Sequence, residues 1–78
     1  MITINFSDSS ILSIKVEDVI LVLKDNSLEP CDIQNHHNLG PIPSLLKALT
    51  DVEYFAVSDD IKVFYNARHI VSIQYLSE

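Results

Sequence analysis

The chain changes its hydrophobic period twice, and this change limits the folds open to it. Apolar and polar residues alternate over 2–16 and again over 52–65, which predicts a half-buried β-hairpin at each place. Between these segments, four apolar residues recur at the spacing of one helical face: Ile42, Leu45, Leu46 and Leu49. Pro41 and Pro43 favour the first turn of that helix. The sequence therefore predicts an α+β fold with one short helix at about 41–51.

The rest of the chain predicts further short strands. The run 19–23 is apolar on every side, and its β-branched residues, followed by turn residues at 25–27, favour a buried strand. Residues 28–38 lose the pattern, so we expect a loop there with a short strand near 31–33. A last strand at 69–76 is expected to extend the preceding hairpin into a three-stranded meander.

Together these segments predict five to six short strands and one helix. No repeat, linker or change of composition divides the chain, so we expect a single domain over 1–78. With so few elements, the expected architecture is a small, strongly bent antiparallel sheet or an SH3-like barrel, with the helix at one end.

The length of 78 residues makes the hydrophobic core marginal. Surface scaling gives about 4,800 Å² exposed in the folded chain and about 12,800 Å² in the unfolded chain. If about 60% of the difference is apolar, its burial contributes about 120 kcal/mol. Ordering every residue at about 1.5 kcal/mol costs about 117 kcal/mol. A balance this close leads us to expect self-association or a bound partner.

The net charge of −6 comes from eleven acidic and five basic residues. The basic residues are scattered along the chain: Lys15, Lys24, Lys47, Lys62 and Arg68. Because nucleic acids and anionic membranes are bound by clustered Lys and Arg, we expect neither as a direct partner. Most of the acidic residues fall at expected bends, where they either keep the surface solvated or form a field that attracts a basic partner.

The N-terminal residues and the apolar runs of the chain indicate in which compartment the protein is expected. Residues 1–6 have no basic residue and no long apolar run, and no run in the chain approaches the about 20 apolar residues that cross a bilayer. We therefore expect a cytoplasmic protein. Cys31 is then expected to be a reduced thiol that acts as a small hydrophobic residue.

Cysteine and histidine side chains are the preferred ligands of zinc, and the chain has four of them: Cys31, His36, His37 and His69. Structural zinc sites usually take their ligands from spaced pairs, whereas two adjacent histidines point in different directions in most backbones. We therefore expect loop histidines and no bound metal.

The motifs of common enzyme classes are absent from the sequence. There is no G-x-S-x-G motif, and the one glycine cannot build a phosphate-binding loop. Glu17 and Asp18, and likewise Asp59 and Asp60, are neighbours at turns, whereas carboxylate catalysis needs groups that converge in a cleft. We therefore expect no catalytic residues, no cofactor and no enzymatic activity.

Apolar residues on both sides of the predicted strands leave two alternatives. Either the sheet closes into a barrel, or a second chain covers its second face. For the second alternative, the expected interface anchors are Tyr54, Phe64 and Tyr65, because aromatic residues dominate interface energetics. Asp59 and Asp60 are the acidic residues expected to act if the partner is basic.

These observations predict a small acidic protein-interaction module that is not an enzyme and that self-associates as a homodimer. A second hypothesis rests on size and acidity, in which the chain resembles small acidic anti-defence inhibitors encoded by phages or mobile elements. Such an inhibitor would bind a basic surface of a host protein that handles nucleic acid. Residues 66–73 also resemble the closing strand of small β-rich bacterial and phage proteins, a resemblance that assigns no role to any residue.

Overall fold

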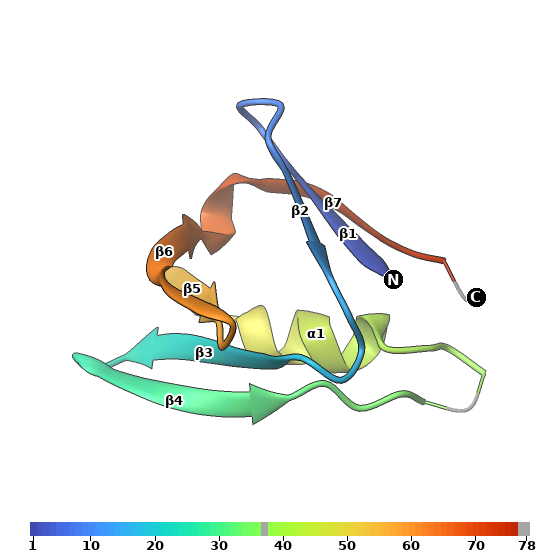
Figure 1. The fold of residues 1–78 in the computed structure, drawn as a ribbon, viewed down its shortest axis with the longest axis horizontal. Coiled ribbons are helices and arrows are strands. Elements are labelled where there is room, and N and C mark those ends of the chain that lie inside the picture. Colours follow the sequence, from blue (N-terminus) through green and yellow to red (C-terminus); the bar gives the residue numbers. More distant parts are fainter. Residues whose placement is uncertain (37, 77–78) are drawn as a thin grey trace.

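Two antiparallel sheets and one α-helix make up the fold in a computed structural model, which describes residues 1–36 and 38–76 (Figure 1). The smaller sheet has the strand order β2-β1-β7 and the larger one β4-β3-β5-β6. The strands are β1 (Ile2–Phe6), β2 (Ile11–Ile14), β3 (Val19–Lys24), β4 (Ser27–Asp32), β5 (Tyr54–Val57), β6 (Asp60–Asn66) and β7 (Ile70–Tyr75). The α+β class with one short helix is confirmed. In the residues that the structure describes, the sheets do not close into a barrel, and there are seven strands where five to six were expected.

The two predicted hairpins are confirmed. Strand β1 pairs with β2 in the register Ile4↔Leu12, and β5 pairs with β6 in the register Phe55↔Tyr65. The turn between β1 and β2 is held by Asp8, whose carboxylate accepts a hydrogen bond of 2.9 Å from the backbone N–H of Ser10. In β1 and β2 the alternation of the sequence is the alternation of more buried and more exposed side chains, whereas β5 has three consecutive buried residues and β6 is exposed over Asp60–Phe64.

Residues 28–38 were expected to form a loop with a short strand near 31–33. This prediction is wrong for residues 28–32, which belong to strand β4. Strand β4 follows β3 after a tight turn in which Asp25 and Asn26 have φ values of 49° and 66°. Two successive positive φ values are typical of a type I′ turn, which matches the twist of a two-residue hairpin. Pro30 weakened the strand pattern, but β4 is an edge strand, where a missing N–H is tolerated.

The predicted three-stranded meander is also wrong. After β6 the chain makes one turn of 3₁₀-helix (η1, Ala67–His69) and then enters the other sheet as β7. There it pairs antiparallel with β1, in the register Ile4↔Ile73. Period and turn signals cannot tell which strand a β-strand will pair with, so this connection was not readable from the sequence.

The predicted helix is confirmed as α1 (Ile42–Leu49). It ends where the N–H of Thr50 bonds to the carbonyl oxygen of Lys47 and where Asp51 takes a φ of 60°. Figure 1 shows α1 between the β3–β4 hairpin and the strands of the smaller sheet. No helix in the described part of the chain is long and apolar enough to cross a membrane.

The core lies between the two sheets and uses one side of each. Its buried residues come from both sheets, from the helix and from the segment after it: Ile2, Ile4, Phe6, Ile14, Ile20, Val22, Leu45, Val52, Phe55 and Val57. Because each strand presents alternate residues to opposite sides, this core accounts for one side of β3 and β5; on the second side of β5, Ala56, which pairs with Leu21, is also fully buried.

Candidate protein-interaction surface

The second side of the larger sheet is apolar and faces away from the core. Along β3, Ile20 and Val22 are fully buried in the core. Val19, Leu21 and Leu23 alternate with them, are half-buried, and lie outside the set of side chains that pack on the core. Strand β3 is therefore apolar on both sides, although the core covers only one of them.

The neighbouring strands continue this apolar side. On β4, Leu28 pairs with Leu23 and Pro30 pairs with Leu21, so both share the side of those residues. On β5, Tyr54 precedes the core residue Phe55 and therefore points the opposite way. Leu28 is 44% exposed and Tyr54 39%. We call this surface the outer face and define it by six residues: Val19, Leu21, Leu23, Leu28, Pro30 and Tyr54.

The outer face is free of charge over most of its extent. Charged residues border it at its two ends: Asp32 pairs with Val19 at one end, and at the other end Leu23 lines a surface pocket with Lys24, Asp25, Asp51, Glu53 and Arg68. Glu29 also belongs to β4, but it pairs with Val22 and so shares the other side of the sheet. In a chain with eleven acidic residues, an uncharged apolar surface on three adjacent strands is unusual, because charged groups are generally spread over the solvent-exposed surface.

A second apolar surface is created by an irregularity in β6. Between the pairs Phe55↔Tyr65 and Val57↔Asp60, β5 contributes one residue, Ala56, whereas β6 contributes four, residues 61–64. These four residues bulge from the ladder, and their apolar members are exposed: Ile61 by 57%, Val63 by 42% and Phe64 by 43%. We call residues 61–64 the β6 bulge.

The three expected aromatic anchors do not share one surface. Tyr54 lies on the outer face and Phe64 on the β6 bulge. The ring of Tyr65 turns inward, with its centroid 5.5 Å from that of Phe6 and 5.5 Å from that of Phe55. Tyr65 therefore packs as part of the fold, while the other two aromatic residues remain accessible.

The two expected acidic residues lie at the β5–β6 turn. Asp59 and Asp60 are both exposed. The Asp60 carboxylate accepts a hydrogen bond of 3.1 Å from the N–H of Lys62, which shapes the start of the β6 bulge. These acids border the bulge and are absent from the outer face.

The outer face was only partly predicted from the sequence. Tyr54 was expected, whereas Leu21, Leu23, Leu28 and Pro30 were not named. The available signals were the run 19–23, apolar on both sides, and the Asp-Asn turn that follows it. Read together, these signals predict a two-sided strand followed by a hairpin partner.

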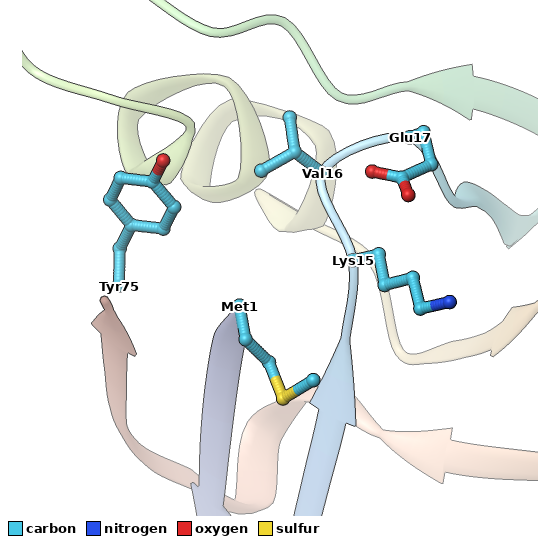
Figure 2. A pocket seen from close by; sticks show the side chains of 5 residues that line it. All are labelled: Met1, Lys15, Val16, Glu17 and Tyr75. Carbon is cyan, nitrogen blue, oxygen red and sulfur yellow. The ribbon is translucent and has the colours of Figure 1, made fainter. Parts of the chain in front are cut away.

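The pockets of the molecule are shallow and sit at the surface. One of about 360 Å³ opens where the ends of β1, β2 and β7 meet (Figure 2). Its lining residues are Met1, Lys15, Val16, Glu17 and Tyr75. Ligand sites generally combine apolar walls with a few fixed polar groups, and no polar side chain in the described residues is buried.

Cys31, His36 and His69 do not share one site. Cys31 is half-buried on β4 and packs against the core, whereas His36 and His69 are exposed. His37 lies outside the described residues. Among the residues that the structure describes, no three His, Cys, Asp or Glu side chains are grouped so that they could hold a metal ion.

Comparison of the chain with protein-family models, with curated proteins and with solved structures found no match.

Proposed function

We propose that this protein is a small acidic protein-interaction module without enzymatic activity, and that it self-associates as a homodimer. The observation that carries the proposal is the outer face, which presents apolar side chains from β3, β4 and β5 on the side of the sheet away from the core. Exposed apolar patches rimmed by polar residues mark protein interaction sites.

The accessible surface supports a partner. The chain exposes 5344 Å², whereas a folded monomer of 8.8 kDa is expected to expose about 4,800 Å². The excess is about 500 Å². A stable interface buries about 800 Å² on each partner, which is about 15% of this surface.

The distribution of charge favours a second copy as that partner. Two chains of charge −6 repel each other, so they can meet closely only through a surface without acids. The middle of the outer face meets this condition, since the acids that border the face lie beside Val19 at one end and beside Leu23 at the other, where Lys24 and Arg68 accompany them. A basic partner would be matched better by an acidic surface than by this one.

A second candidate function rests on the β5–β6 turn. There the exposed acids Asp59 and Asp60 adjoin the exposed apolar residues of the β6 bulge, Ile61 and Phe64 among them. This pairing suits the inhibitor hypothesis, in which the chain covers a basic surface of a protein that handles nucleic acid. Charge would then steer association and apolar contacts would hold the complex.

Ionic strength separates the two candidates, and the native protein can be measured directly by sedimentation equilibrium at 1–300 µM. A homodimer of two acidic chains is expected at the upper concentrations, and its Kd should stay constant or fall as salt rises from low to physiological strength, because salt screens the mutual repulsion. A chain that remains monomeric throughout would overturn self-association. An acidic inhibitor bound to a basic partner would show the opposite trend, with an association rate that falls steeply as salt rises.

A further inference from the structure

A second copy of the chain can add to a sheet along an edge strand or on an open face, and one edge of the larger sheet is interrupted by Pro30. The carbonyl oxygen of Val19 accepts a hydrogen bond of 2.9 Å from the N–H of Ser58, so the backbone groups of Val19 point toward β5. In an antiparallel ladder this direction repeats every second residue, so those of Leu21 do the same. Its partner Pro30 therefore turns its backbone toward the open edge of β4, where proline has no N–H to donate.

The other edge is interrupted by the β6 bulge. Four residues opposite one break the regular row of donors and acceptors that an added strand would need. The N–H of Lys62, which lies in this stretch, already bonds to the carboxylate of Asp60. Prolines and bulges on edge strands are the devices by which proteins prevent the addition of further strands.

With both edges interrupted, the outer face is the larger continuous surface by which the larger sheet can associate. We infer that a second copy of this chain packs face to face on the outer face, with Leu21 and Pro30 of each copy at its centre. This inference rests on the proposed self-association and adds where it takes place. Two sheets packed in this way lie about 10 Å apart and interdigitate their side chains, so each larger sheet would be covered on both sides.

A charge placed on this face tests the inference, because an interface centre does not tolerate an unpaired carboxylate. Leu28→Glu places the charge on an exposed residue of an edge strand, where the fold of the single chain is little affected. Ile11→Glu is the matched control, since Ile11 is also exposed, by 65%, and lies on the edge strand β2 of the smaller sheet. Ile61→Glu is a second control, which places a carboxylate on an exposed residue of the β6 bulge.

The dimer Kd of each variant is measured by sedimentation equilibrium, after circular dichroism has shown that the variant is folded. Leu28→Glu is expected to raise Kd by about 30-fold or more, while Ile11→Glu and Ile61→Glu change it by less than about threefold. If Leu28→Glu does not fold, Tyr54→Ser takes its place, with an expected increase of about tenfold or more.

The outcomes distinguish this inference from the proposed function. A wild-type chain that is monomeric overturns both. A wild-type dimer that survives Leu28→Glu and dissociates with Ile61→Glu or Ile11→Glu keeps the self-association and overturns its placement on the outer face.

Discussion

The ring of Tyr65 stacks on the ring of Phe6, with the centroids 5.5 Å apart and the ring planes 16° from parallel. Phe6 belongs to the smaller sheet and Tyr65 to the larger one, so this pair joins the two sheets. Tyr65 also lies 5.5 Å from the buried ring of Phe55, which is its partner in the ladder. These two aromatic contacts hold β6 in place at Tyr65, the residue that directly follows the β6 bulge.

The first prediction concerns this stack. Tyr65→Ala is expected to lower the free energy of unfolding by about 2 kcal/mol, because it removes a half-buried ring from two aromatic contacts. Tyr65→Phe keeps both contacts and is expected to change it by less than about 0.5 kcal/mol. Urea unfolding followed by circular dichroism gives both values. Equal losses in the two variants would show that the ring does not join the sheets.

Much of the fold could be predicted from the sequence, because period reports local structure. Alternation indicated the hairpins, and the spacing of Leu45 among its apolar neighbours indicated the helix. Which strands pair is decided by long-range contacts, so the pairing of β7 with β1 was not predictable. The same limit applied to the expected anchors, since only the three-dimensional arrangement turns Tyr65 inward and leaves Tyr54 outside.

The second prediction concerns the closed edge of β4. Pro30→Thr restores an N–H that points to solvent and should allow strands to add there. We expect species larger than a dimer to form at several hundred micromolar, as measured by light scattering. Glu29→Thr is the control, because the backbone of Glu29 already faces β3 and gains no free donor. Equal growth of large species in both variants would count against the edge-blocking role of Pro30.

The third prediction concerns the turn between β3 and β4. Asn26 has a φ of 66°, which a β-branched side chain adopts only at a cost. Asn26→Val is therefore expected to lower the free energy of unfolding by about 1–2 kcal/mol. Asn26→Gly accepts this φ freely and should leave the value unchanged or higher. A Val variant as stable as the Gly variant would contradict the type I′ turn.

The fourth prediction concerns pH. The Ser10 hydroxyl and N–H donate hydrogen bonds to the Asp8 carboxylate and hold its pKa below the ordinary value of 3.8. Because the folded-state pKa is the lower one, the stabilisation from Asp8 is present above pH 3.8 and is lost as the pH falls through the folded-state pKa. A carbon-detected NMR titration should show this lowered pKa. Ser10→Ala removes the hydroxyl and should return the pKa part of the way toward 3.8, and a titration unchanged by Ser10→Ala would rule out the Ser10 hydroxyl as the main cause.

The central claim is that a second copy of the chain packs on the outer face, and isotope-filtered NMR of a mixed sample tests it most directly. Labelled and unlabelled chains are combined at several hundred micromolar, and only contacts between different copies are recorded. We predict intermolecular contacts among the methyl groups of Leu21, Leu23 and Leu28 and the ring of Tyr54. Intermolecular contacts confined to Ile61, Val63 and Phe64, or none at all, would contradict it.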